Sequence, residues 1–292
     1  MSALRAWLDA FRGAGSGLRG QGANTLDEQL VGLRIYQPLE TTTEIVRMFF
    51  RVLRVIVTPP FSWVRESVVE TSKALRLVTA PLLFSSMMYV LAFGSVLLGA
   101  IIYALGVPDR VGPGVYIAVL RELGTWLAYM ILAGVVASAL TGDLGARKIR
   151  DELDALSVLG VDQFRTLIVP RVVAIWFCGV IVSLLSVLTD TIGVLIVDQY
   201  TIHQPVGPQL QGVFLNMNVY DLVAVLLKHS ILGIFIGVVA CQQGLAARGG
   251  AEGVGRAVST TVIITFVGIW LINSVFNTAY LTLVPDAISL KG

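Results

Sequence analysis

The sequence predicts an all-α membrane protein, made of an N-terminal interfacial amphipathic helix, five transmembrane helices and a short cytoplasmic helix between the second and third spans. Its 292 residues are 55% hydrophobic and only 14% charged, whereas a soluble domain carries roughly 25% charged residues. Several apolar runs reach the ~20 residues that a helix needs to cross a bilayer. These runs are continuous, unlike the alternating ~10-residue segments of a membrane β-barrel, and a helix satisfies its own backbone hydrogen bonds in lipid.

The N-terminal part is expected to lie outside the spans. Residues 1–40 hold scattered charges and a glycine-rich stretch, which indicates a flexible cytoplasmic segment. Residues 41–80 are expected to form interfacial, amphipathic helices, the first over Glu44–Val57, which at ~21 Å is too short to cross. The basic stripe of this helix is formed by Arg47, Arg51 and Arg54. Opposite a Phe-rich face, such a stripe is typical of a helix in the headgroup plane; a soluble amphipathic helix is the alternative.

Residues 81–292 are expected to form a five-helix membrane domain. The predicted spans are about 81–106, 123–141, 167–197, 219–242 and 258–284. The segments that an inside N-terminus makes cytoplasmic are 1–80 and the loops after the second and fourth spans, and they hold ten, five and two of the 21 Lys and Arg residues, where the five include Arg171 at the start of the third span. Because basic residues favour the cytoplasmic side, we expect a cytoplasmic N-terminus and an extracytoplasmic C-terminus.

The loop after the second span predicts a short amphipathic helix over about residues 145–160, bounded by Gly145 and Gly160. Its apolar positions, spaced i, i+4 and i+7, are Ile149, Leu153 and Leu156. The charged residues around them are Asp143, Arg147, Lys148, Arg150, Asp151, Glu152 and Asp154. Mixed charge of this kind fits a solvated connecting helix as well as a docking surface for a soluble partner. The position beneath two spans favours a partner.

A second group of charges is expected in the outer half of the bundle. Arg121 and Glu122 open the second span, and Asp221 and Lys228 lie two turns apart on one face of the fourth. Lys228 lies ~12 Å in from Tyr220 by helix rise. A cation at that depth indicates function, unless it snorkels to the interface or forms a structural pair with Glu122.

Several blocks of the sequence match, in order, the signature of a known family. They are Leu120–Gly124, Gly142–Gly145, Asp151–Leu156, Leu159–Asp162, Val169–Arg171 and Gly249–Ala257. Together they closely resemble the MlaE/YrbE family, the permease subunits of MCE-associated lipid ABC transporters, over about residues 45–285. The form of Ala251–Arg256 is more similar to the actinobacterial YrbE branch.

The resemblance implies a permease dimer in the cell inner (plasma) membrane, with a related paralogue as the second subunit. The helix at about 145–160 would be a coupling helix that docks on a cytoplasmic ABC ATPase dimer, and Glu44–Val57 would be the family's interfacial elbow helix. Lipid would pass between the permease and MCE-domain proteins on the extracytoplasmic side. Thr125 and Gln163 stand where members of the family often have proline, which leaves the choice of partners open.

The resemblance also implies a lipid pocket. The residues that match its charged lining are Arg121, Glu122, Asp221, Lys228 and Asn273. Asn273 stands where some relatives have an acid, so this pocket is expected to be less negative. The hypothesis is that Lys228 and Arg121 bind an anionic lipid headgroup while apolar walls hold the acyl chains.

Other classes of protein fit the sequence less well. An intramembrane acyltransferase or protease would need a catalytic constellation at membrane depth, and His203 and His229 predict interface or packing positions. A secondary transporter of hydrophobic molecules would predict inverted repeats, and five spans do not divide into two equal halves. The chain has no GxxxxGK[ST] phosphate loop, so ATP and Mg²⁺ are expected in a separate ATPase subunit. No catalytic residue, cofactor, metal or nucleic acid is expected on this chain.

Overall fold

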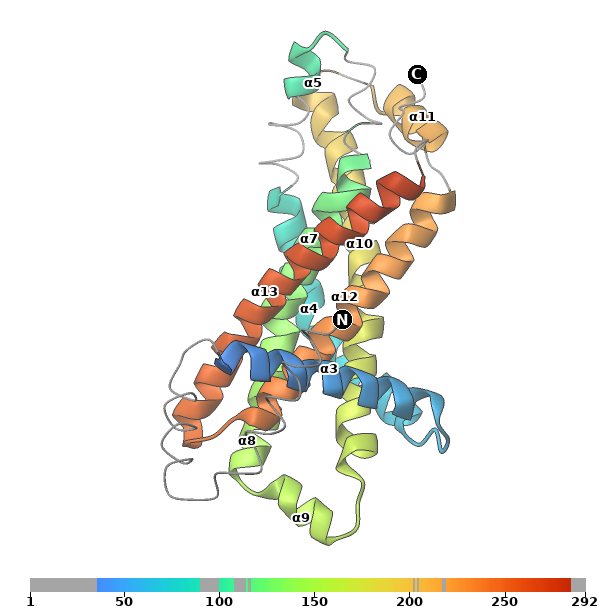
Figure 1. Cartoon of the computed structure of the whole chain (residues 1–292). Coiled ribbons are helices and arrows are strands. Elements are labelled where there is room, and N and C mark those ends of the chain that lie inside the picture. Colours follow the sequence, from blue (N-terminus) through green and yellow to red (C-terminus); the bar gives the residue numbers. More distant parts are fainter. Residues whose placement is uncertain are drawn as a thin grey trace, which may run out of the picture. The chain divides into compact units, whose positions relative to one another are not determined.

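The computed structural model describes residues 36–89, 100–107, 114, 117–201, 203, 205–216 and 219–284 (Figure 1). Every regular element in these ranges is a helix, which confirms the all-α class. The helical segments that are long and apolar enough to cross a membrane are Val119–Ile149, Phe164–Tyr200, Val219–Ala246 and Gly250–Leu283. They correspond to the four expected spans from residue 123 onward, and each extends further than expected at one or both ends.

The first expected span, 81–106, lies partly outside the described residues. Within it the structure shows the end of α4 (Trp63–Tyr89) and the short α5 (Ala100–Ala104). Because α4 begins at Trp63, the amphipathic stretch before residue 81 and the apolar residues after it form one helix. Pro81 lies inside α4, where neighbouring groups can satisfy the freed carbonyl.

The N-terminal helix α3 (Tyr36–Val57) begins earlier than the interfacial helix expected from Glu44. Its 22 residues span ~33 Å, so the expectation that it is too short to cross a membrane was wrong. Its first turns are polar, with Glu40 and three consecutive threonines, and composition rather than length keeps it from being a candidate span. The flexible segment expected at 1–40 lies mostly outside the described residues, but its end belongs to α3. The boundary between two compact units, Met1–Met48 and Phe49–Gly292, falls within this helix.

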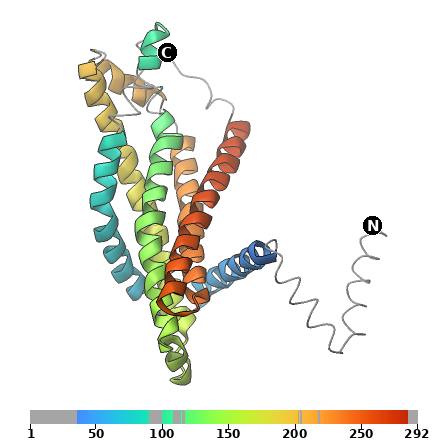
Figure 2. The ribbon, with the colours of Figure 1, turned by 90° about the vertical axis from the view of Figure 1, so that its left-hand side faces the viewer.

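The second unit is a helix bundle arranged around α10 (Figure 2). After α5 its elements are η3 (Val119–Leu123), α7 (Gly124–Leu132), η4 (Ala133–Ala137), α8 (Ser138–Ile149), α9 (Glu152–Val158), η5 (Phe164–Ile168), α10 (Val169–Thr201), α11 (Val206–Asn216), α12 (Val219–Ala246) and α13 (Gly250–Leu283), where η marks a π-helical turn. α10 packs against α4, α7 and α12, and α12 also packs against α8 and α13. The long helix of the second span, Val119–Ile149, contains two π-helical turns, η3 and η4.

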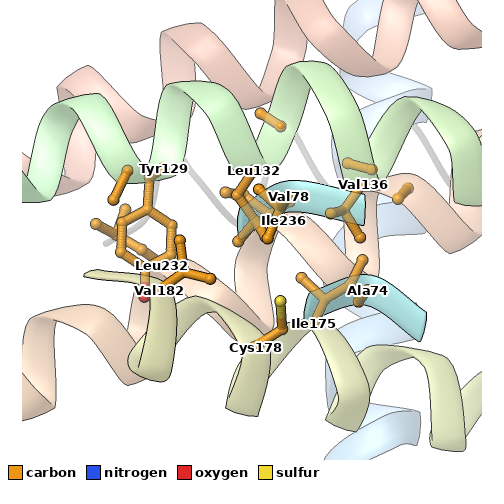
Figure 3. Packing of buried hydrophobic residues seen from close by; sticks show 14 of the residues in the cluster. Ala74, Val78, Tyr129, Leu132, Val136, Ile175, Cys178, Val182, Leu232 and Ile236 are labelled. Atoms are coloured by element: carbon orange, nitrogen blue, oxygen red, sulfur yellow. The ribbon is translucent and has the colours of Figure 1, made fainter. Parts of the chain in front are cut away.

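Apolar side chains from α4, α7, α10 and α12 meet in the core (Figure 3). Val78, Leu132 and Ile236 are completely buried there. In lipid, close packing rather than escape from water holds such helices together. Two glycines one turn apart allow α10 and α12 to approach closely: a Cβ at Gly233 would lie 2.9 Å from the Cα of Trp176, and one at Gly237 would lie 3.1 Å from the Cα of Val172.

Candidate functional site

The segment expected to form one helix at about 145–160 is a bent hairpin of two helices. α8 continues from the bundle to Ile149, and α9 begins at Glu152. Between them Asp151 has a left-handed backbone with φ of 58°, which turns the chain and ends the i, i+4, i+7 face that the sequence predicted. Gly145 does not bound a helix but lies within α8, where an added Cβ would be 3.2 Å from Val254. The chain does leave α9 near Gly160, whose φ is 73°.

Most of the charged residues expected to dock a partner form ion pairs with one another in this hairpin. Asp143 accepts from Arg147 at 3.1 Å and from Arg171 of α10 at 2.6 Å. The other ion pairs are Arg147–Glu152 at 3.6 Å, Arg150–Glu152 at 2.8 Å and Lys148–Asp154 at 3.4 Å. Arg171 is buried, so the pair with Asp143 ties α8 to α10. Exposed pairs contribute only ~0.2–1 kcal/mol each, but together they fix the angle of the hairpin.

Apolar side chains cover the tip of the hairpin. Val158 is 87% exposed and Leu159 is 75% exposed, whereas Leu153 is buried and Leu156 is half-buried. The sequence analysis named Leu156 and missed Val158 and Leu159. The signal was present in the sequence, because Val158 and Leu159 lie directly before Gly160, where the helix ends and no following turn covers them.

The other side of the hairpin is held by polar contacts. The Gln163 side-chain amide donates to the carbonyl oxygen of Leu153 and, at 2.5 Å, to the Ser157 hydroxyl. Asp162 accepts from the backbone N–H of Phe164 at 2.9 Å and so begins η5. The Gln163 contacts hold α9 against the segment that leads through η5 into α10.

The part of α3 from Phe49 onward packs at the same end of the bundle. Arg51 lies over the ring of Phe164, 4.2 Å from its centroid, and Arg165 donates to the carbonyl oxygen of Pro60 at 3.1 Å. Of the predicted basic stripe, Arg51 and Arg54 are exposed, and Arg47 lies in the first unit. Arg51 thus connects the end of α3 to η5, next to the hairpin.

The second charge cluster joins η3, α12 and α13, near the end of the bundle opposite α9. Arg121 and Asp221 form an ion pair at 2.8 Å, with side chains that are 15% and 4% exposed. The Tyr280 hydroxyl donates to the same carboxylate oxygen at 2.7 Å. The sequence analysis placed Asp221 with Lys228; the structure instead pairs it with Arg121 and adds Tyr280.

Lys228 is 2% exposed and binds neutral partners. It donates to the backbone carbonyl oxygen of Arg121 and, at 3.2 Å, to the side-chain oxygen of Asn277. η3 supplies that carbonyl, because a π-helical turn takes backbone groups out of the usual i→i−4 pattern. Among the described residues Lys228 has no carboxylate within salt-bridge distance, so the direct pair with Glu122, which the sequence left open as an alternative, is not formed.

Glu122 is held instead by two amides of α13. Asn273 donates to one carboxylate oxygen at 2.6 Å, and Asn277 donates to the other. Asn277 therefore bridges Lys228 and Glu122, a role that the sequence analysis missed. The cavity beside Lys228 measures about 10 Å³, which is room for about one water molecule. In this form the cluster is closed.

A buried polar column continues from the cluster into the core. His229 is fully buried, as the packing interpretation expected, but it also bonds to the hydroxyls of Thr125 at 2.8 Å and Ser183 at 2.6 Å. One turn further, Ser186 donates to Asp190 at 3.1 Å. Ser183, Ser186 and Asp190 follow i, i+3, i+7 spacing along α10, a polar stripe in an apolar helix that was visible in the sequence.

Long apolar helices in one bundle, with ion pairs inside it and a charged hairpin at one end, define a multi-pass membrane protein. Residues 71–279 match the family described as Permease MlaE, so the chain belongs to the MlaE permease family. This confirms the resemblance found in the sequence.

Curated relatives carry related names. The chain is 31% identical over 173 residues to the probable ABC transporter permease protein slr1045 of Synechocystis, covering 58% of this chain and 64% of the relative. It is 24% identical over 238 residues to the probable ABC transporter permease protein ycf63 of Pyropia yezoensis, covering 80% and 88%. It is 25% identical over 184 residues to the chloroplastic protein TRIGALACTOSYLDIACYLGLYCEROL 1 of Arabidopsis thaliana, covering 63% and 53%. The match spans less than two thirds of the Synechocystis and Arabidopsis relatives. Relatives of this permease family member are thus named as probable permeases of ABC transporters.

Proposed function

We propose that this chain is the permease subunit of an ATP-driven transporter that moves lipid, or another hydrophobic substrate, between the membrane and MCE-domain proteins. The family supports the permease role, and the Arabidopsis relative carries the name of a galactolipid. The chain has no GxxxxGK[ST] loop, so the ATPase is a separate subunit. The distribution of Lys and Arg supports five spans in the plasma membrane, with the N-terminus inside and the C-terminus outside. The second permease subunit is a related paralogue.

The hairpin of α8 and α9 is the proposed coupling element, and its geometry carries the proposal. Its apolar tip, Val158 and Leu159, is exposed for an ATPase groove, while α8 continues without a loop into the bundle. The Asp143–Arg171 pair ties the base of the hairpin to α10. A displacement of α9 by nucleotide-driven closure of the ATPase would therefore move two membrane helices together.

The charge cluster is the proposed lipid-facing element. Opening it requires Lys228 to leave two neutral acceptors, whereas Arg121 must leave the carboxylate of Asp221. Lys228 is the more readily released cation, because its two acceptors are neutral, whereas release of Arg121 separates a bond in which donor and acceptor are both charged. An anionic headgroup could replace its neutral partners without separating an ion pair.

Co-purification tests the coupling role. We expect an ATPase subunit to co-elute with the wild-type chain and to be lost when Glu152 and Asp154 are both changed to lysine, because reversal of their charge breaks the ion pairs that hold α9. Glu66→Lys, an exposed reversal on α4, is the matched control and should keep the ATPase. Co-elution that survives the double reversal would contradict the coupling role, and the lack of any ATPase would favour a secondary transporter.

Lipid movement tests the charge cluster separately. Lys228→Ala and Lys228→Met should lower lipid transport at least about tenfold, the effect of losing one ion-assisted contact, with the ATPase still bound. Retained ATPase shows that the variants fold. Unchanged transport would exclude Lys228 from the lipid path.

A further inference from the structure

A cavity of about 310 Å³ lies between α4, α8 and α10, at the end of the bundle that carries α9. It is separate from the Lys228 cluster and lies within the size range of small-ligand sites, ~300–1,000 Å³. Its charged lining residues are Glu70, Lys73, Asp143, Arg147 and Arg171. The resemblance and the relatives assign it no role.

The lining changes from charged to apolar in the same direction on all three helices. On α4, Glu70 and Lys73 are followed by Leu77 further into the bundle. α8 runs the opposite way, so Leu140 lies deeper than Arg147. On α10 the charged residue, Arg171, again comes before the apolar residues Ala174 and Ile175. The cavity therefore has a polar mouth toward the α9 end and an apolar interior.

Its depth matches half of a bilayer. From Arg147 to Val136, both of which line the cavity, the helix rises ~16 Å. Half of the ~30 Å hydrocarbon core is ~15 Å. A polar mouth and an apolar interior at this depth fit one leaflet, with the headgroup at the mouth and an acyl chain inside.

The charges at the mouth favour an anionic headgroup. Glu70 neutralises Lys73 at 2.8 Å, and Asp143 is shared between two guanidinium groups, those of Arg147 and Arg171. Among the lining residues three cations and two carboxylates leave one positive charge in excess, and the further carboxylate near Arg147, that of Glu152 at 3.6 Å, lies outside the lining. Arg171 is 7% exposed, and its Nη1 has no hydrogen-bond partner among the described residues. A buried guanidinium nitrogen without an acceptor is costly, and a phosphate in this cavity lowers that cost by its charge.

We propose that this cavity binds one phospholipid of the leaflet on the α9 side, with its phosphate beside Lys73, Arg147 and Arg171 and an acyl chain along Leu77 and Leu140. The proposed orientation makes this the cytoplasmic leaflet, whereas binding itself does not depend on transport. Because Asp143 also holds the coupling hairpin, the bound lipid contacts the residues that tie α8 to α10.

The test uses the full chain with its co-eluting partners in phosphatidylcholine nanodiscs. The probe is a phosphatidylglycerol with a photoreactive diazirine in one acyl chain, and labelled peptides are mapped after illumination. We expect labels on the α4 and α8 residues that line the cavity. The same diazirine on a diacylglycerol, which lacks the phosphate, should label them much less.

Two variants and one control make the result specific. Lys73→Glu reverses a charge at the mouth, and Ala139→Trp fills the interior from an exposed lining position. In the proposed site Lys73 contacts the phosphate directly, and a hydrogen bond to a charged group contributes about 1.5–3 kcal/mol, so Lys73→Glu should lower labelling at least about tenfold. Arg76→Glu, an exposed reversal on α4 that does not line the cavity, should leave labelling unchanged.

Equal labelling of wild type and both variants, or equal labelling by the diacylglycerol probe, would overturn the proposal and indicate ordinary surrounding lipid. ATPase co-elution is measured on the same samples. Lost labelling with the ATPase still bound therefore supports the lipid site, whatever becomes of the proposed transport function.

Discussion

Replacing Gly233 by alanine tests how closely α10 and α12 approach. The added Cβ would lie 2.9 Å from the Cα of Trp176, whereas ordinary contacts begin at 3.4 Å. The two helices must therefore separate by about 0.5 Å, because neither backbone can rotate away. Alanine gains up to ~1 kcal/mol of helix propensity, but overpacking costs about 1–3 kcal/mol, so we expect net destabilisation of about 1 kcal/mol. Thermal unfolding of the purified chain in detergent should show a midpoint lower by a few degrees.

Gly255→Ala on α13 is the matched control. Its added Cβ would meet nothing within 4 Å, so only the favourable helix propensity remains and the midpoint should stay or rise. Gly237→Ala, one turn from Gly233, should lower the midpoint in the same way. If Gly233→Ala is as stable as Gly255→Ala, the close contact of α10 with α12 is wrong.

Three further substitutions or labels test other features of the structure. Asp151→Gly should keep ATPase co-elution, because glycine adopts a positive φ without strain, whereas Asp151→Val should lose it; equal behaviour would contradict the left-handed turn between α8 and α9. His229→Ala should destabilise the chain by about 2–4 kcal/mol in thermal unfolding, since it leaves the Thr125 hydroxyl without its partner and opens a cavity; an unchanged midpoint would mean that the hydrogen bond does not form. Cys178 and Cys241 are fully buried, so a maleimide should label them only after denaturation; rapid labelling of the native chain would contradict their burial.

The fold class and most spans could be predicted from the sequence because they depend on long-range composition. Apolar runs of helical length have one stable form in lipid, and four of them appear as expected. Helix ends were less predictable. The apolar periodicity through Leu153 continues smoothly across Asp151, and a single left-handed residue without a neighbouring glycine or proline gives no local signal of the break.

The sequence indicates which charged residues gather near one end of the bundle, but not which of them are in contact. Arg121, Glu122 and Lys228 do lie together, but which charge meets which depends on the rotation of each helix. The bridge formed by Asn277 could not be predicted either, because an asparagine in a membrane helix has no characteristic spacing. The polar column was detectable from the spacing of Ser183 and Asp190 on α10, yet its partner, His229, lies on another helix and could be found only in the structure.

ATP-dependent lipid transfer tests most directly whether this chain is a lipid permease driven through the α8–α9 hairpin. The measurement uses proteoliposomes that contain the chain with its co-eluting partners, and follows a fluorescent phospholipid as it moves between the membrane and the MCE-domain protein. We expect transfer that requires ATP and is lost when Glu152 and Asp154 are both changed to lysine. In Lys228→Ala the transfer rate should fall at least about tenfold with the ATPase still bound. Lipid transfer of equal rate without ATP, or with the reversed hairpin, would contradict the proposed function.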